Sequence, residues 1–414
     1  MERIDIVSHA PAMPLAPSPT AVPPEVSVVI PCLNEAETIA VCVAKARAAM
    51  DAHGIRGEVI VSDNGSADGS RTLAADAGAR VVHAPRRGYG AALQVGIAAA
   101  RGRYVIMGDA DDSYDFTEVP AFVERLREGF DLVQGCRLPP GRGRVLRGAM
   151  PALHRWLGNP ALTAIARRFF ASPLNDVYCG LRGFRRERML TLDLRSKGME
   201  FAAEMVMKAS LAGFSMAEIP ITLHPDGRTA HPPHLNTFRD GWKTLRLFLV
   251  YSPRWVFTYP AFALMGAGAA AFALGLLGVR VGSVHLEAHT LLVGSLALLV
   301  GYQALIFGVA ARAFAAREGL LPHSKRIARL TRRRWVEAGI VLGGALGVLG
   351  LTLLAVAGLQ WRAAGFGDLD YAVSMRWVIP ATLCIAAGAQ TVFATFLLAL
   401  FATAPGDRAA GGAA

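Results

Sequence analysis

The sequence predicts an α/β domain with a mostly parallel sheet, followed by an all-α membrane domain of four transmembrane helices. From Val26 to about Asp112, short apolar runs alternate with helix-length segments, which is the pattern of βαβ units. Beyond residue 255 lie four apolar segments, each long enough to cross about 30 Å of hydrocarbon. With 53% hydrophobic and only 18% charged residues, the 414-residue chain is too apolar for an ordinary soluble domain.

Residues 1–25 are rich in proline and alanine, and we expect a flexible tail there. The α/β domain is then expected to span residues 26–235. Turn-forming residues stand at both ends of each apolar run, as is typical of strands in parallel sheets. The expected strands lie at 26–30, 58–63, 79–84 and 103–109, then less regularly at 131–135, 181–184 and 214–223, with helices at 148–170 and 200–210.

The segment 236–255 joins this domain to the membrane segments. Within it, Phe238 and Trp242 recur at helical spacing opposite Arg239 and Lys243. This pattern predicts an amphipathic helix that lies in the membrane interface. An ordinary helix packed on a core is the alternative interpretation.

The membrane domain is expected to fill residues 256–404, before a second short tail at 405–414. Seven of the 12 cations beyond residue 255 fall between Arg317 and Arg334, in one loop. Positively charged loops stay on the cytoplasmic side, so we expect a multi-pass protein of the cytoplasmic (inner) membrane whose α/β domain and both termini are cytoplasmic. The four expected spans are 256–279, 288–311, 336–359 and 377–402.

The net charge of +11 does not indicate a nucleic-acid-binding protein. Residues 1–255 hold 31 Lys and Arg against 26 Asp and Glu, without a basic stripe interleaved with aromatic residues. Anionic lipid beside the membrane segments explains the basic character better. The five cysteines lack metal-ligand spacing, which argues against a zinc site and against a disulfide scaffold.

The strongest signal is the run Gly-Asp-Ala-Asp-Asp-Ser-Tyr-Asp at 108–115, because it directly follows an apolar strand. A parallel strand that ends in Asp-x-Asp aims its carboxylates at the carboxyl edge of the sheet, where ligands bind. Asp109 and Asp111 would suit Mg²⁺ or Mn²⁺ on a diphosphate. A solvated acidic turn that caps a helix is the alternative.

The ends of the first two expected strands carry further polar or turn residues, and these should face the same crevice. Asp63 offers acceptor oxygens to a base or ribose. Gly88 begins a later helix, where backbone amides could approach a ligand, although a tight turn explains this glycine equally well. The candidate residues at the two strand ends are Pro31, Asn34, Glu35, Asp63 and Gly65.

The order of motifs along residues 26–230 resembles family 2 glycosyltransferases with a GT-A fold. It is most similar to the branch of dolichol-phosphate mannosyltransferases and bacterial polyprenyl-phosphate glycosyltransferases. The motifs that carry the resemblance are PCLNEAETI, SDNGSADGS, RRGYGAALQVGI, GDADDSY, GCRLPPG, DVYCGLRGFRR, GMEFAAEMVMKA and EIPITLHPDGR.

This resemblance implies a GDP- or UDP-hexose donor, a polyprenyl phosphate acceptor and a divalent metal, and it is compatible with a homo-oligomer. It implies that Asp63 recognises the nucleotide and that Asp109 and Asp111 hold the metal. Arginines that bind donor or lipid phosphate in the family match three positions here. One of them, Arg137, could instead simply anchor a loop. The remaining implied residues are Pro31, Asn34 and Glu35 in the nucleotide pocket, and the arginines Arg137, Arg182 and Arg228.

The implied acceptor requires no general base, because a phosphate monoester is already anionic near neutral pH. The lipid phosphate would attack the anomeric carbon opposite the leaving diphosphate and invert it. The sequence departs from the family pattern after Asp111 and after Arg228, where Thr-Ala-His-Pro-Pro-His follows. The choice between mannose and glucose therefore stays open.

Two other functions fit parts of the sequence. A processive polysaccharide synthase shares the core and the spans, but the pairs Arg254-Trp255 and Arg334-Trp335 lack the glutamine of its Gln-x-x-Arg-Trp motif. A nucleotide-binding domain that regulates a transporter would call for ionisable residues within the spans. The expected spans hold almost none away from their ends.

Overall fold

The computed structural model describes residues 23–229, 237–317, 321 and 333–402, which form two compact units. Unit 1 comprises the described parts of 1–159, 174–202 and 214–234. Unit 2 comprises those of 160–173, 203–213 and 235–414. Two short stretches of the expected α/β domain therefore belong to the same unit as the long apolar helices.

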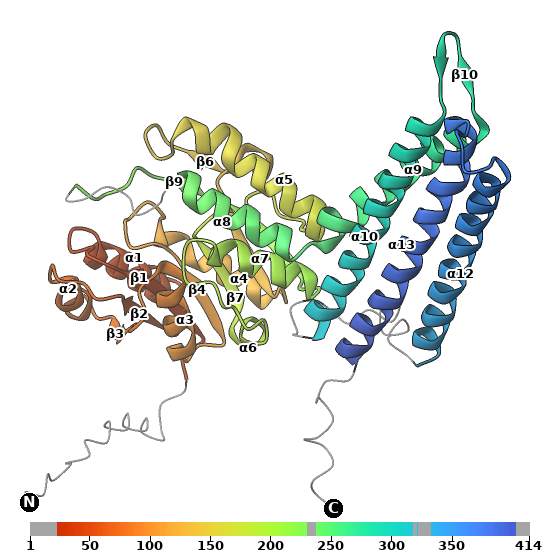
Figure 1. Ribbon diagram of the computed structural model, residues 1–414. Helices are drawn as coiled ribbons and strands as arrows, with labels where there is room; N and C mark the ends of the chain where they lie inside the picture. Colours follow the sequence, from red (N-terminus) through yellow and green to blue (C-terminus); the bar gives the residue numbers. More distant parts are fainter. Residues whose placement is uncertain (1–22, 230–236, 318–320, 322–332, 403–414) are drawn as a thin grey trace, which may run out of the picture. The chain divides into compact units, whose positions relative to one another are not determined.

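Unit 1 is built on a seven-stranded, mostly parallel sheet in the order β3-β2-β1-β4-β7-β5-β8 (Figure 1). Only β7 runs antiparallel to its neighbours, between β4 and β5. The predicted α/β class and the first four predicted strands are confirmed. The strands are β1 (Val26–Cys32), β2 (Gly57–Asp63), β3 (Arg80–His83), β4 (Tyr104–Met107), β5 (Leu132–Cys136), β7 (Arg182–Arg185) and β8 (Met216–Pro220).

Helices cover both faces of this sheet, which explains why β1 and β4 are apolar at nearly every position. On one face, Val28 of β1 belongs to the same core as Val43 and Phe122. On the other face, Gly96 lies so close to Val29 that an added Cβ would be 2.4 Å from Val29 Cγ1. The helices of the first face are α1 (Ile39–Ala52), α2 (Ser70–Asp76) and α4 (Val119–Arg127), and α3 (Tyr89–Ala99) covers the second.

Two expected elements are interrupted in the structure. The helix expected at 148–170 begins later because Gly148 has a left-handed backbone (φ +85°) and Pro151 follows. A π-helical turn, η3 (His154–Gly158), then leads into α5 (Asn159–Phe170). The strand expected at 214–223 is split, since β9 (Thr222–Leu223) leaves the main sheet and pairs with β6 (Arg144–Val145).

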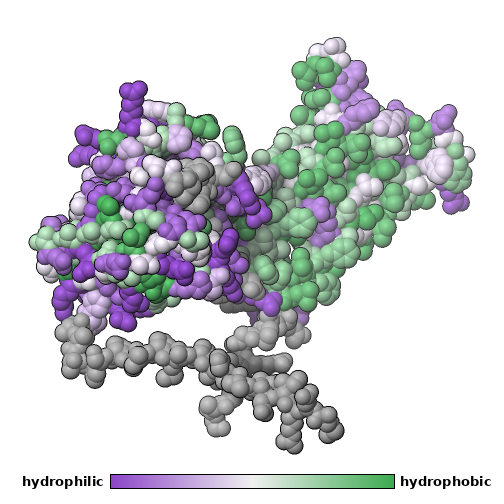
Figure 2. Space-filling model, turned by 90° about the vertical axis from the view of Figure 1, so that its left-hand side faces the viewer, coloured by the Kyte–Doolittle hydropathy of each residue, from purple (hydrophilic) through white to green (hydrophobic). Residues whose placement is uncertain are grey.

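Unit 2 contains four helices that are long and apolar enough to cross a membrane. Their surface is mostly hydrophobic (Figure 2), and the predicted number of spans is confirmed. They are Arg254–Leu277, formed by η4 (Arg254–Thr258) and α9 (Tyr259–Leu277), then Ala288–Arg317 (α10), Arg334–Ala363 in α12 (Arg333–Ala363) and Tyr371–Phe401 in α13 (Tyr371–Ala402).

The predicted amphipathic helix is α8 (Thr237–Val250). Phe238 and Trp242 are 81% and 60% exposed, whereas Asp240, Thr244 and Phe248 are buried. Arg239 and Arg246 are exposed as well, so the outer face mixes aromatic and basic side chains, as suits a helix at the membrane interface. This membrane role of α8 stays a prediction.

The remaining elements are short or cross the two units. Unit 1 also holds η1 (Phe116–Glu118), η2 (Pro139–Gly141) and α6 (Arg186–Leu190), while α7 (Phe201–Leu211) begins in unit 1 and continues in unit 2. A hairpin of β10 (Arg280–Val281) and β11 (Val284–His285) joins α9 to α10.

Glycines allow α9 and α10 to touch backbone to backbone. A Cβ at Gly268 would lie 2.7 Å from the Leu298 backbone nitrogen, and one at Gly275 would lie 2.5 Å from that of Leu291. By contrast, an added Cβ at Gly266, on the same helix, meets nothing within 4 Å. Close helix contact therefore explains some, but not all, of the membrane glycines.

We expect Gly268→Leu to lower the free energy of unfolding by about 1–3 kcal/mol, because the new side chain must push α10 away. Gly266→Leu is the matched control on the same helix and should have little effect. Thermal unfolding of both variants in detergent measures the difference. Equal melting temperatures for the two variants would show that the close contact is not formed.

Candidate functional site

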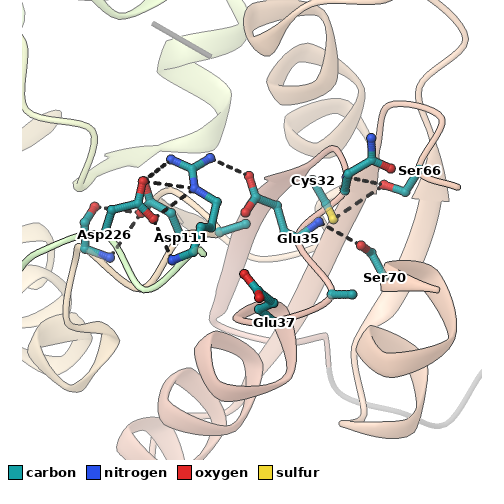
Figure 3. A network of polar contacts seen from close by, with 12 residues as sticks. Cys32, Glu35, Glu37, Ser66, Ser70, Asp111 and Asp226 are labelled. Carbon is teal, nitrogen blue, oxygen red and sulfur yellow. Dashed lines mark hydrogen bonds and ion pairs between the residues drawn. The ribbon is translucent and has the colours of Figure 1, made fainter. Parts of the chain in front are cut away.

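The loops after β1 and β2 in unit 1 are joined by hydrogen bonds. The Asn34 backbone N–H donates to Ser66 Oγ (2.9 Å), and Asn34 Oδ1 accepts from the Ala67 N–H (2.9 Å). The Glu35 N–H donates to Ser70 Oγ (2.8 Å), as Figure 3 shows. Asn34 has a left-handed backbone (φ +59°), which asparagine tolerates better than most residues. These contacts fix the turn that presents Glu35.

The predicted nucleotide-binding residue Asp63 is fully buried at the end of β2. Its carboxylate accepts hydrogen bonds from the backbone N–H groups of Gly65 (3.0 Å) and Ser66 (3.2 Å). Pro31 lies beside it in β1, in register with Ser62 of β2. Asp63 therefore shapes the loop that carries Gly65, and its role toward a nucleotide stays a prediction.

Gly88 is held in place by the side chain of Asn64. Asn64 Oδ1 accepts a hydrogen bond from the Gly88 N–H (2.7 Å), and Asn64 also donates to the Arg86 carbonyl (2.7 Å). Gly88 has φ +130°, and an added Cβ would lie 2.2 Å from the Lys197 carbonyl oxygen. This crowding favours the tight-turn interpretation, because a neighbouring loop already occupies the space that a side chain would need.

The acidic pair follows β4, as predicted, at the edge where β1 and β2 also end. Asp109 Oδ1 accepts a hydrogen bond from the Tyr89 hydroxyl (2.7 Å). The absence of a side chain at Gly180 makes room for this carboxylate, since an added Cβ would lie 2.7 Å from Asp109 Oδ2. Burial, and then the negative charge of Asp111, raise the pKa of Asp109 to about 6. A cation would relieve this repulsion.

Arg228 already places one cation at Asp111 of the pair, and Figure 3 labels the three carboxylates that this arginine contacts, Glu35, Asp111 and Asp226. Its Nη2 lies 3.2 Å from Asp111 Oδ2 and its Nη1 lies 2.8 Å from Glu35 Oε1, and it also pairs with Asp226. Burial disfavours the charged guanidinium, but these carboxylates outweigh it and raise the pKa of Arg228. Ser113 Oγ donates to the other Asp111 oxygen (2.6 Å).

The backbone around Arg228 is also fixed to the site. The Gly227 N–H donates to the Asp111 carbonyl (2.9 Å), and the Thr229 N–H donates to the Glu37 carboxylate (2.7 Å). The structure therefore brings together Glu35, Asp111 and Arg228 from segments almost 200 residues apart in the sequence. The His-Pro-Pro-His motif that follows lies outside the described residues.

The other two predicted arginines are deeply buried. Arg137 makes a two-pronged ion pair with Asp176, with Nε–Oδ2 at 2.7 Å and Nη2–Oδ1 at 2.9 Å, and it donates to the Tyr114 hydroxyl (3.1 Å). This geometry favours the loop-anchoring alternative for Arg137. Arg182 is fully buried, and its guanidinium donates to the Ala202 carbonyl (2.8 Å). Burial lowers the pKa of Arg182.

Both buried arginines act on the acidic pair through their charge, because each of them favours the ionised form of Asp109. They therefore belong to the surroundings of the site even where their hydrogen bonds are used elsewhere. The sequence analysis did not single out Tyr89, Ser113 or Asp226, although each lies inside one of the quoted motifs. Their place inside the motifs is the sequence signal that could have identified them.

The carboxylates of Asp109 and Asp111 fit a divalent metal ion that a substrate phosphate also binds. Within the described ranges, no cluster of three or more His, Cys, Asp or Glu side chains could hold an ion by itself. Mg²⁺ is commonly bound by one or two carboxylates together with substrate phosphates. Asp109 and Asp111 supply that number of carboxylates, and the repulsion between them favours a cation.

Comparisons with known proteins find family matches in both parts of the chain. Residues 27–189 match the family described as glycosyl transferase family 2, and residues 309–402 match the glycosyltransferase family 2 C-terminal transmembrane region. The low-salt glycan biosynthesis hexosyltransferase Agl6 of Haloferax volcanii is 36% identical over 377 residues, covering 91% of this chain and 88% of that protein. The dolichyl-phosphate hexose transferase of the same organism is 30% identical over 186 residues, covering 45% of this chain and 77% of that protein.

Solved structures show a more distant likeness. Glucosyl-3-phosphoglycerate synthase from Mycobacterium tuberculosis, in complex with Mn²⁺, UDP and glucosyl-3-phosphoglycerate, is 23% identical with a TM-score of 0.42. The match covers 55% of this chain and 78% of that chain.

We expect Asp176→Ala to lower the free energy of unfolding by about 3–5 kcal/mol, because it leaves the buried Arg137 charge uncompensated. Glu128→Ala removes only an exposed pair with Arg125 and should cost less than about 1 kcal/mol. Denaturant unfolding of the two variants separates them. If Asp176→Ala is as stable as Glu128→Ala, Arg137 does not depend on this anchor.

Proposed function

Since the chain belongs to glycosyltransferase family 2, we propose that it transfers a hexose from a nucleotide-sugar to a polyprenyl phosphate. The family and the four apolar helices together identify a membrane glycosyltransferase with a GT-A-like fold. The proposal of a nucleotide-sugar donor and a polyprenyl phosphate acceptor rests on the acidic pair at the end of β4, where Arg228 contacts Asp111.

The donor diphosphate is proposed to bind at Asp109 and Asp111. A divalent cation bound there, Mg²⁺ or Mn²⁺, would neutralise charge on the leaving diphosphate. Tyr89 orients Asp109 through its hydroxyl, and Ser113 orients Asp111. Arg228, whose planar fork matches phosphate oxygens, can exchange a carboxylate for a phosphate while staying charged.

A lipid phosphate is the acceptor that this site suits. A phosphate oxygen is anionic at neutral pH and can attack the anomeric carbon without a general base, displacing the nucleoside diphosphate with inversion. The carboxylates of Asp111 and Glu35 are both paired with Arg228, so neither is a ready base. The names of two relatives, a hexosyltransferase and a dolichyl-phosphate hexose transferase, support a hexose and a lipid-linked product.

The catalytic unit is proposed to face the cytoplasm. The positively charged segment between α10 and α12 supports this orientation, since Lys and Arg concentrate in cytoplasmic loops. The hairpin at β10 and β11 would then face the opposite side of the membrane.

The decisive experiment incubates the purified protein with polyprenyl phosphate, Mg²⁺ or Mn²⁺ and a panel of UDP- and GDP-hexoses. We expect lipid-dependent release of a nucleoside diphosphate, with a glycolipid detected by mass spectrometry. Asp111→Asn should lower the rate at least about 100-fold, because it removes charge stabilisation at the diphosphate. Chelation of the metal should have a similar effect.

Asp112→Asn is the matched control for this experiment. Asp112 pairs with Lys45 instead of Arg228, and asparagine tolerates its left-handed backbone (φ +59°). This variant should keep most of the activity. Polymer formed without lipid would indicate a synthase, and nucleotide binding without turnover would indicate a regulatory domain; either result would contradict the proposal.

Orientation has its own test. In a cysteine-free background, we expect Gly282→Cys in the hairpin to react with a membrane-impermeant maleimide in intact cells. Glu128→Cys in unit 1 should react only after permeabilisation. The reverse pattern would place the catalytic unit outside the cytoplasm.

A further inference from the structure

Two arginines of unit 2 are not among the residues assigned above to the proposed transfer reaction. Arg254 begins η4, at the start of the first span, and Arg312 lies five residues before the end of α10. Both therefore lie near the ends of apolar segments. A charged side chain at such a position is favourable only where it reaches water or an anion.

Close packing brings these two arginines to one place. A Cβ at Gly308 of α10 would lie 3.0 Å from Phe257 Cβ and 3.2 Å from Thr258 Oγ1 of η4. Arg312 follows Gly308 by four residues, so it lies on the same face of α10, about one turn further on. Arg254 precedes Thr258 by four residues, and the two helices run in opposite directions, so both arginines lie about one turn from the same contact.

The pair is not neutralised by the described residues. Because both arginines lie about one turn from the contact between Gly308 and η4, two like charges are placed near each other. Neither is in an ion pair within the described ranges, where the pairs of unit 2 join Glu204 to Lys208 and Asp240 to Lys243. Adjacent like charges beside an apolar span therefore call for an external anion.

The surroundings indicate the depth of the membrane headgroups. Trp255, next to Arg254, stacks on Phe169 with ring centroids 4.9 Å apart. The Arg168 guanidinium lies 4.3 Å from the centre of the Trp255 ring and adds a third cation nearby. Tryptophan prefers the boundary between hydrocarbon and headgroups, which is where lipid phosphates lie.

We infer that Arg254 and Arg312 form a binding site for the phosphate group of a membrane lipid. Two guanidinium forks that converge on one phosphate replace mutual repulsion by charge-assisted hydrogen bonds. An anionic phospholipid or the polyprenyl phosphate acceptor could supply this group. In the second case the inference deepens the proposed function and rests on it; in the first it is independent of it.

Native mass spectrometry of the full-length protein tests the inference. Phosphatidylglycerol, phosphatidylcholine, polyprenyl phosphate and inorganic phosphate are added separately to the delipidated protein. We expect at least one of the two anionic lipids to bind, and the double variant Arg254→Gln/Arg312→Gln to bind it roughly tenfold more weakly, as loss of charged hydrogen bonds implies. Phosphatidylcholine, which has no net charge, and inorganic phosphate, which has no lipid chain, should bind weakly.

Arg317→Gln is the matched control, since it removes the same charge from an exposed position on the same helix. It should keep the affinity of the unaltered protein. If the double glutamine variant does not fold, Arg254→Lys/Arg312→Lys keeps both charges but removes the planar guanidinium groups. Its lipid affinity should be lower than that of the unaltered protein and higher than that expected for the double glutamine variant. Equal lipid binding by the unaltered protein and the arginine variants would overturn the inference.

The lipid that binds identifies the source of the phosphate. Preference for phosphatidylglycerol indicates a membrane headgroup, and preference for polyprenyl phosphate indicates the acceptor. Because binding is measured without turnover, Asp111→Asn should bind lipid normally even though its transfer activity is lost. A failure of the proposed reaction is therefore distinguishable from a failure of this site.

Discussion

The balance of charge at the end of β4 is the constraint on which the catalytic unit depends. Burial, and then the negative charge of Asp111, raise the pKa of Asp109, so the two aspartates are both ionised at low cost only with a cation nearby. Arg228 supplies a cation from a segment distant in sequence and joins Asp111 to Glu35. The end of β1, the end of β4 and the segment after β9 are thereby held together by one guanidinium group. A donor that binds at this point has to share or replace that group.

Much of the fold could be predicted from local sequence patterns. The apolar runs that become β1 to β4 are bounded by turns, and the four apolar helices exceed the thickness of a bilayer, so period and length were sufficient. The position of β7 was not predictable, because an antiparallel strand between β4 and β5 is set by distant pairing. The left-handed backbone at Gly148 shortened an expected helix for a local reason that composition alone does not reveal.

In the candidate site, too, the features set by local sequence were predictable and those set by distant contacts were not. The acidic pair could be found because its motif directly follows a strand, whereas its contact with Arg228 joins segments that only the folded chain brings together. Arg137 illustrates the difficulty: its motif predicts phosphate binding, yet its guanidinium faces the carboxylate of Asp176, nearly 40 residues away. A sequence motif specifies the type of side chain, but the charge it meets is decided by the tertiary structure.

Gly180 shows how a position without a side chain can be as constrained as a catalytic one. The Asp109 carboxylate and the Tyr114 ring both occupy the volume that a Cβ would need, at 2.7 and 2.8 Å. Even alanine would disturb an acid of the proposed metal site and the tyrosine that contacts Arg137 at the same time. Glycine at position 180 is therefore required by the two side chains that fill this volume, and over evolutionary time the position should change far less than exposed positions of unit 1.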